Sequence, residues 1–369
     1  MFRPDIGWSN FEKRSMRSKK KEPGRELNKR TNGNNKNNLK TQPSFFAIGI
    51  GASAGGINAV SELITQLPTN LNAAVFVVFH LSKVAVPEIL LERLKKRTKL
   101  LCKVANDKEP IEPGTIYLAS PDAHLLVKDK NILLGHGPTE NRFRPSIDVL
   151  FRSIAADFGE RSIGIVLTGF LNDGTVGMNA IKQSGGYTIV QDPNEAEYPD
   201  MPLSVLETME ADYCTSLKKM GDAISQITKN AKVKGVTPPT VVTLESKLSE
   251  RAATSIEKVS QLGNKSIYAC PDCGGGLWQI DKPSIHYRCH IGHSYTEKDL
   301  LYKQSESIEH TLWVSVRMME ERRLLLLKNA TSYNEKGLQK LSEQYSERAE
   351  QMQTHILKLK ELLFKINKD

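Results

Sequence analysis

The chain has 369 residues, of which 39% are hydrophobic and 25% are charged, and its net charge is +9. This length allows two or more globular domains. No apolar run reaches 18 residues, which argues against a membrane span. The N-terminus is polar and basic and has no apolar signal core, so we expect a cytoplasmic protein.

The positive charge is concentrated at the N-terminus. Residues 1–43 hold 12 Lys or Arg and 4 Asp or Glu, so they account for +8 of the +9. This segment is rich in Asn and poor in apolar residues, and it therefore predicts a disordered basic tail. The remaining chain is close to neutral, which argues against a nucleic-acid partner.

Residues 44–230 alternate between short apolar runs and amphipathic segments. The apolar runs predict strands at 45–50, 73–79, 116–119, 124–127, 132–134, 162–167 and 187–190. The amphipathic segments predict helices at 57–67, 87–97, 146–158, 177–183 and 220–228. This alternation indicates an α/β domain with a mainly parallel, doubly wound sheet. The short middle strands predict a hairpin at one edge of it.

The rest of the chain has a different pattern. Residues 231–265 begin with a polar, Pro-containing stretch that predicts a linker. Residues 266–296 are rich in Cys and His, and 297–369 are helical with a break near 329–337. Apolar residues at three-four spacing in the last helix predict a helical hairpin or coiled coil, through which the chain could self-associate.

Three reactive side chains follow predicted strands of the first domain. Ser53 lies on a glycine-rich turn after the first strand, His80 ends the strand at 73–79, and Asp173 follows the strand at 162–167. Because the carboxyl ends of parallel strands meet at one edge of a sheet, these side chains can converge. A hydroxyl, an imidazole and a carboxylate form the catalytic triad of serine hydrolases.

Other interpretations of these residues are open at this point. The spacing of Gly49, Gly51 and Ala54 also fits a loose dinucleotide-binding fingerprint, although no acid follows the second strand to bind a ribose. Such a site would make the protein a nucleotide-binding oxidoreductase. His80 alone fits a structural histidine, and Asp173 alone fits a cap for a helix that begins at Gly174.

Five segments together resemble the chemotaxis protein-glutamate methylesterase (CheB-type) family. They are residues 48–56, 79–80, 141–151, 167–174 and 201–202. The resemblance implies that Ser53 is the nucleophile, His80 its base and Asp173 the orienting acid. It also implies hydrolysis of glutamyl methyl esters on chemoreceptor helices with release of methanol, deamidation of receptor glutamines, and no cofactor for catalysis.

The resemblance leaves details and an alternative open. Backbone amides of Ala54 and Phe170 are candidate donors to the oxyanion. Arg142 and Arg144 either orient the substrate or brace a loop. Family members typically begin with a receiver domain, for which the 44 residues before the fold are too short. A second hypothesis is a binding module that has this fold but no activity and acts as a scaffold in a signalling complex.

The Cys-rich segment predicts a metal site. Cys270 and Cys273 form a Cys-x2-Cys turn, and Cys289 and His293 follow as Cys-x3-His. Three sulfurs and one imidazole suit a structural, tetrahedral zinc ion. His286 and His290 are rival imidazoles. A redox Cys-x2-Cys would need a βαβ context that is absent here. We expect the module to serve in packing or partner docking.

Overall fold

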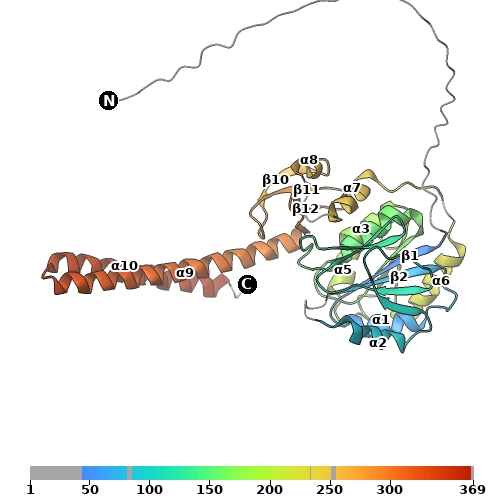
Figure 1. The fold of residues 1–369 in the computed structure, drawn as a ribbon, viewed down its shortest axis with the longest axis horizontal. Coiled ribbons are helices and arrows are strands. Elements are labelled where there is room, and N and C mark those ends of the chain that lie inside the picture. Colours follow the sequence, from blue (N-terminus) through green and yellow to red (C-terminus); the bar gives the residue numbers. More distant parts are fainter. Residues whose placement is uncertain (1–43, 81–84, 233, 251–254, 367–369) are drawn as a thin grey trace, which may run out of the picture. The chain divides into compact units, whose positions relative to one another are not determined.

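In a computed structural model, which describes residues 44–80, 85–232, 234–250 and 255–366, the first domain is built on a seven-stranded sheet (Figure 1). Its strands run in the order β3-β4-β2-β1-β7-β8-β9, and each neighbouring pair is parallel. They are β1 (Phe46–Ala52), β2 (Ala73–Phe79), β3 (Leu101–Val104), β4 (Thr115–Leu118), β7 (Ser162–Val166), β8 (Tyr187–Gln191) and β9 (Tyr213–Thr215). The prediction of a mainly parallel α/β sheet is confirmed. The tail predicted at 1–43 lies outside the described residues.

Helices cover both faces of this sheet. One face packs against α1 (Gly56–Thr65), α2 (Pro87–Lys95) and α6 (Met220–Asn230). The other packs against α3 (Ile147–Phe158), α4 (Thr175–Gln183) and α5 (Asp200–Thr208), and short 3-10 turns span Gly159–Arg161 and Leu217–Lys219. Side chains along β1 alternate between these two cores, as the period of a strand requires.

Two glycines of β1 let α3 approach the sheet closely. A Cβ at Gly51 would lie 2.4 Å from the Ile147 side chain, and one at Gly49 would lie 2.8 Å from the Phe151 ring. Helix α3 therefore occupies the space beside these glycines and leaves no room for a phosphate. This argues against a dinucleotide-binding site. This close packing places the N-terminus of α3 at the carboxyl end of β1.

Some elements differ from the prediction. The hairpin of β5 (His124–Lys128) and β6 (Asn131–Gly135) forms a separate two-stranded sheet instead of an edge of the main one. It packs on α3, where the Ser153 hydroxyl accepts a hydrogen bond from the Val127 N–H at 3.0 Å. The sequence analysis did not predict β3, β9 or α5.

The segment predicted as a linker contains two helices, α7 (Thr240–Ser249) and α8 (Ile256–Val259). Helix α7 begins directly after Pro239 and packs on α3, with Val242 in the core that α3 shares. Its apolar residues recur at helical spacing, and this pattern is hidden in the sequence by the polar residues between them.

The Cys/His module is a four-stranded antiparallel sheet followed by two long helices. Its strands are β10 (Asn264–Ala269), β11 (Gly276–Ile280), β12 (His286–Cys289) and β13 (Ser294–Tyr295). Helices α9 (Glu297–Glu335) and α10 (Gln339–Ile366) form a hairpin that buries Val316, Ile356 and Leu363. Contacts assign Gln42–Asp369 to one compact unit. Among the described residues, no helix is both long enough and apolar enough to cross a membrane.

Candidate active site

Ser53 and His80 lie at the same edge of the sheet. Ala52 pairs with Phe79 at the end of β1 and β2, and the His80 N–H donates to the Ala52 carbonyl at 3.4 Å. Ala52 and Phe79 are the last residues of their strands, and Ser53 and His80 directly follow them. The register therefore places Ser53 beside His80.

His80 is held by Asp173. The imidazole Nε2 lies 2.8 Å from Asp173 Oδ2, and the two side chains are 2% and 0% exposed. The other ring nitrogen, Nδ1, is buried and has no hydrogen-bond partner among the described residues. No hydrogen bond joins it to the Ser53 hydroxyl in this structure, and catalytic hydrogen bonds often tighten only when substrate binds.

The Asp173 carboxylate accepts six hydrogen bonds. Besides His80, its donors are the side chains of Asn141 and Ser146 and the backbone N–H groups of Ile147, Asp148 and Gly174, at 2.6–3.2 Å. Two of these N–H groups open α3, so the carboxylate takes the place of an N-cap there. The close approach of α3 to β1 thus positions Asp173, and Asp173 in turn positions His80.

This cradle, defined as Asp173 and its six donors, keeps the carboxylate charged. Burial acts to raise the pKa of Asp173, but the hydrogen bond and the charge of His80, with the Asn141 and Ile147 donors, hold the pKa below its ordinary value. Neighbouring Asp148 has fewer donors, from Asn141 and from the Gly177 N–H. Burial and the Asp173 charge raise the pKa of Asp148 to about 8.

Two side chains of the cradle region had no assigned role in the sequence analysis. Asn141 bridges the two carboxylates, donating to Asp148 Oδ2 at 2.6 Å and to Asp173 Oδ1 at 2.9 Å. The Phe143 ring lies flat on the His80 imidazole, with centroids 3.5 Å apart and an interplanar angle of 3°. Both residues fall in the segment 141–151 that carried the family resemblance, and this was the signal available to find them.

The two candidate oxyanion donors flank Ser53. The Ser53 N–H donates to the Thr168 carbonyl at 3.0 Å, and Gly169 packs so closely that a Cβ there would lie 2.7 Å from Ser53 Cβ. Ala54 follows Ser53, and Phe170 follows Gly169. Among the described residues, neither of their N–H groups has a hydrogen-bond acceptor. Both N–H groups are therefore available to a ligand.

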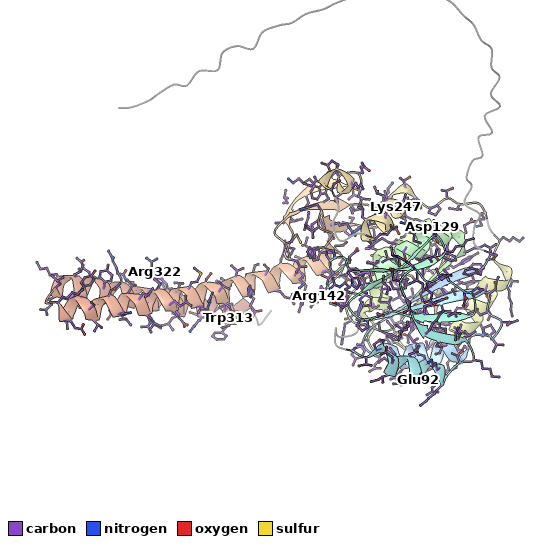
Figure 2. The ribbon with its side chains drawn as sticks, in the orientation of Figure 1. Glu92, Asp129, Arg142, Lys247, Trp313 and Arg322 are labelled. Atoms are coloured by element: carbon purple, nitrogen blue, oxygen red, sulfur yellow. The ribbon has the colours of Figure 1, made fainter. Side chains whose placement is uncertain are left out.

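The two arginines have different surroundings. Arg144 braces a loop, because its guanidinium donates to Asp122 Oδ1 and to the Gly137 carbonyl, each at 2.6 Å. Arg142 lies 3.9 Å over the Tyr302 ring and 3.5 Å from Glu306, both on α9 (Figure 2). The first turns of α9 therefore cover the arginine that we expected to face the substrate.

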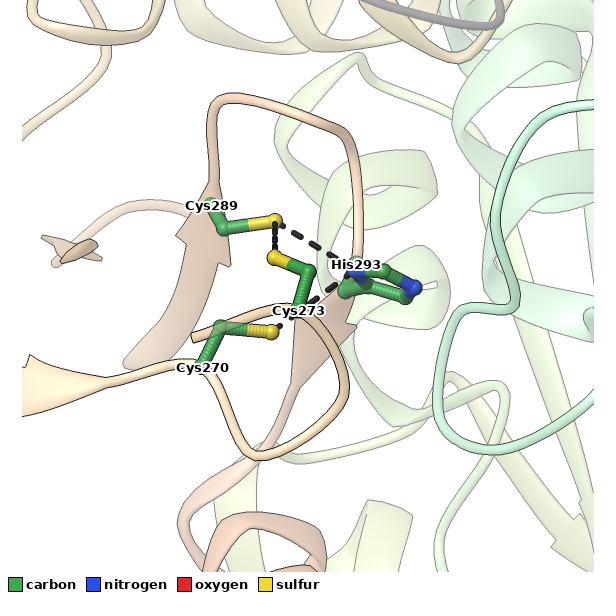
Figure 3. Close-up of side chains that lie close together, drawn as sticks. All are labelled: Cys270, Cys273, Cys289 and His293. Carbon is green, nitrogen blue, oxygen red and sulfur yellow. Dashed lines mark hydrogen bonds between the residues drawn. The ribbon is translucent and has the colours of Figure 1, made fainter. Parts of the chain in front are cut away.

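The four predicted metal ligands lie together (Figure 3). His293 Nδ1 is 3.6 Å from Cys270 Sγ and 3.5 Å from Cys289 Sγ, and the Cys273 and Cys289 sulfurs are 3.8 Å apart. All four ligand atoms lie within 4.8 Å of one another. The rival His286 instead pairs with Glu245 at 2.9 Å. The cluster can hold a metal ion.

Comparisons with known proteins point to one family. The family model for the CheB methylesterase matches residues 48–224. A Leptospira interrogans protein, provisionally named protein-glutamate methylesterase/protein-glutamine glutaminase, is 38% identical over 188 residues, which are 51% of this chain and 97% of that protein. A Methanosarcina mazei protein-glutamate methylesterase/protein-glutamine glutaminase is 36% identical over 203 residues, which are 53% of this chain and 55% of that protein.

A solved structure also matches. The CheB methylesterase catalytic domain of Thermotoga maritima is 31% identical, with a TM-score of 0.48, and the match covers 50% of this chain and 100% of that one. The Cys/His module and the two long helices lie outside the residues that the family model matches.

Proposed function

This chain belongs to the CheB methylesterase family, and we propose that its first domain is a serine esterase that removes methyl groups from glutamate side chains of a helical signalling protein. The observation that carries the proposal is the His80–Asp173 pair at the strand end where Ser53 lies, because the other ring nitrogen of His80 has no hydrogen-bond partner among the described residues. Methanol is the expected product.

The residues supply each step of ester hydrolysis. Ser53 Oγ attacks the ester carbonyl while His80 Nδ1 takes the hydroxyl proton, and Asp173 stabilises the imidazolium. The Ala54 and Phe170 N–H groups donate to the oxyanion, and one such donor is typically worth about 3 kcal/mol. His80 then protonates the departing methanol. Water attacks the glutamyl ester of Ser53 with His80 again as base, which releases glutamate and restores Ser53. With a glutamine side chain, the same steps release ammonia.

The partner follows from this chemistry. We expect a methylated chemoreceptor or a similar helical protein. Exposed apolar residues along α9 and α10, Trp313, Leu324, Leu357 and Phe364 among them, support self-association through the hairpin. For this reaction we propose a cytoplasmic location.

The test is methanol release from a methylated receptor cytoplasmic fragment. Wild-type protein should release methanol, and Ser53→Ala should lower the rate by about 10⁴-fold or more. Circular dichroism should show that the variant keeps its fold. Undiminished turnover by Ser53→Ala would exclude this nucleophile. No turnover by the wild type would favour the alternative of an inactive scaffold.

We further propose that Cys270, Cys273, Cys289 and His293 hold a structural zinc ion. With Zn–S of about 2.3 Å and Zn–N of about 2.0 Å, a tetrahedron has S···S edges of about 3.8 Å and S···N edges of about 3.5 Å. The distance between the Cys273 and Cys289 sulfurs, and the distances from His293 Nδ1 to the Cys270 and Cys289 sulfurs, match these edges. Elemental analysis of the purified protein should find one zinc per chain.

A further inference from the structure

The segment 294–296, which directly follows His293, contacts both loops that hold Asp173. On one side, the Asn141 N–H donates to the Ser294 carbonyl at 2.9 Å, and Glu140 forms a parallel bridge with Ser294. On the other side, Asn172, the residue before Asp173, lies between Thr296 and Asp299. The amide orientation that satisfies both has its nitrogen donating to Asp299 Oδ2 at 2.7 Å and its oxygen accepting from the Thr296 hydroxyl.

Both loops contain residues in the left-handed backbone region. Asn141 and Arg142 have φ of 48° and 73°, and Leu171 has φ of 69°. For residues with a side chain such as Arg or Leu, this conformation is strained and persists only when surrounding contacts hold it. The contacts from 294–296 are among those that hold these loops beside Asp173.

The segment 294–296 also contacts the predicted metal site, which consists of Cys270, Cys273, Cys289 and His293. His293 precedes Ser294, and its carbonyl accepts from the Cys289 N–H at 3.0 Å, while the Tyr295 hydroxyl lies 3.2 Å from Cys270 Sγ. A ligand set that is closed around a metal would therefore fix the position of 294–296. The Leptospira relative is matched over nearly its whole length without this module, so these contacts are an addition to the catalytic domain.

We propose that the Cys/His module is a positioning element for the catalytic carboxylate, acting through the Ser294 carbonyl on Asn141 and through the Thr296 hydroxyl on Asn172. The inference rests on the proposed esterase function for its kinetic consequence. It assigns Thr296 and Asn141 as positioning residues: they hold Asp173, and Asp173 holds His80. Loss of the module's contacts should lower turnover more than substrate affinity, because the substrate does not touch them.

The first test removes the Thr296 hydroxyl. We expect Thr296→Val to lower kcat by about tenfold with KM within about twofold of wild type, since misplacing catalytic groups far from the substrate costs rate. Thr296→Ser keeps the hydroxyl and should restore kcat. Thr311→Val, the same change at an exposed site on α9, which directly follows Thr296, should leave both constants unchanged. Equal losses in Thr296→Val and Thr296→Ser, or a kcat of Thr296→Val equal to wild type, would overturn the proposal.

The second test does not depend on the esterase activity. Hydrogen exchange is measured on wild-type protein and on the Cys270→Ser/Cys273→Ser variant, with metal content determined for both. We expect faster exchange in peptides covering 139–148 and 168–176 of the variant, and unchanged exchange in β1 and β2. Unchanged exchange in both loop peptides, in a variant that has lost its metal, would overturn the proposal even if the esterase assay succeeds. If the double variant does not fold, the same peptides are compared in Thr296→Val and Thr296→Ser, and equal exchange in the two overturns the proposal.

Discussion

Two buried polar clusters touch helix α3, and they are built differently. The cradle at its N-terminus gives one carboxylate, Asp173, six donors, three of which are backbone N–H groups. The second, which we name the junction cluster, joins α3 to α7 and to β12 of the Cys/His module. Its members are Glu140, Arg152, Glu245, Ser249, His286 and Arg288.

The junction cluster is satisfied less completely. Arg288 lies 3.0 Å from Glu140, and Arg152 also pairs with Glu140, yet Arg152 Nε, Arg288 Nε and Glu245 Oε2 are buried without a hydrogen-bond partner among the described residues. Burial acts to raise the pKa of Glu140, but the charges of Arg152 and Arg288 hold it below its ordinary value. Each charge here therefore depends on side chains from other segments, whereas half of the donors to Asp173 are backbone N–H groups.

This difference shows what positions the side chains of each cluster. Backbone donors at a helix start are positioned by the fold itself and need no side-chain ordering at the moment of reaction. A cluster of paired side chains is held only when three segments dock together. We infer that the first arrangement suits an active site and the second suits a joint between two parts of a molecule.

Breaking the cradle should have the largest effect. Asp173→Asn removes the charge that stabilises the His80 imidazolium and turns an amide nitrogen toward groups that donate. We expect kcat to fall by about 10³–10⁴-fold, as for other triads that lose this carboxylate. Methanol release is measured beside Asp222→Asn, the same change at an exposed site on α6, which should behave as wild type. A loss below tenfold would show that Asp173 does not orient the base.

Breaking the junction cluster should lower stability instead of chemistry. Arg288→Met leaves Glu140 and Glu245 buried with one cation fewer, and removing one partner of a buried ion pair costs about 3–5 kcal/mol. Urea unfolding would measure this loss. The exposed pair of Arg317 and Glu321 provides the contrast: Arg317→Met should change stability by less than about 0.5 kcal/mol.

A double variant separates the lost pair from lost packing. Adding Glu140→Gln to Arg288→Met removes one of the charges left unpaired, so the double variant should be more stable than Arg288→Met alone. If the stability loss of the double variant equals the sum of the losses of the two single variants, Glu140 and Arg288 do not interact in solution.

Much of the fold could be predicted because its central strands are fully buried. β1, β2 and β7 read as continuous apolar runs, and their bounds were predicted to within two residues. The edge strands β3 and β9 are short and partly exposed, so their sequences carry no such run. The hairpin β5–β6 was found, but its packing on α3 is a tertiary choice that periodicity does not encode.

The residues of the candidate site also fall into those that the sequence predicted and those that it did not. Ser53, His80 and Asp173 were predicted because each follows a buried strand, and the Cys and His spacing predicted a metal site. Asn141 and Phe143 lie in a loop without periodicity, and their contacts arise only when that loop folds over the sheet edge. The docking of Arg288 against Glu140 joins residues distant in the sequence, so no local pattern could predict it.

The smallest effect concerns the Asp148 carboxylate, which accepts two hydrogen bonds where the Asp173 carboxylate accepts six. Burial and the Asp173 charge raise the pKa of Asp148 to about 8, whereas an unfolded chain has an aspartate pKa of about 3.9. Between these values the folded protein holds one more proton than the unfolded chain. The free energy of unfolding therefore falls as pH rises through this window, and the full penalty is present above about pH 8.

Asp148→Asn removes this titration and so tests whether the number of donors decides the charge state of the two neighbouring carboxylates. Wild type should lose more stability than Asp148→Asn between pH 6 and pH 9, by more than about 1 kcal/mol, when both are unfolded in urea at each pH. Other groups with a raised pKa, such as Asp299 and His286, are present in both proteins and cancel in the difference. If the stability difference between the two proteins were the same at both pH values, Asp148 would be charged throughout, and six donors would be no better than two at keeping a buried carboxylate ionised.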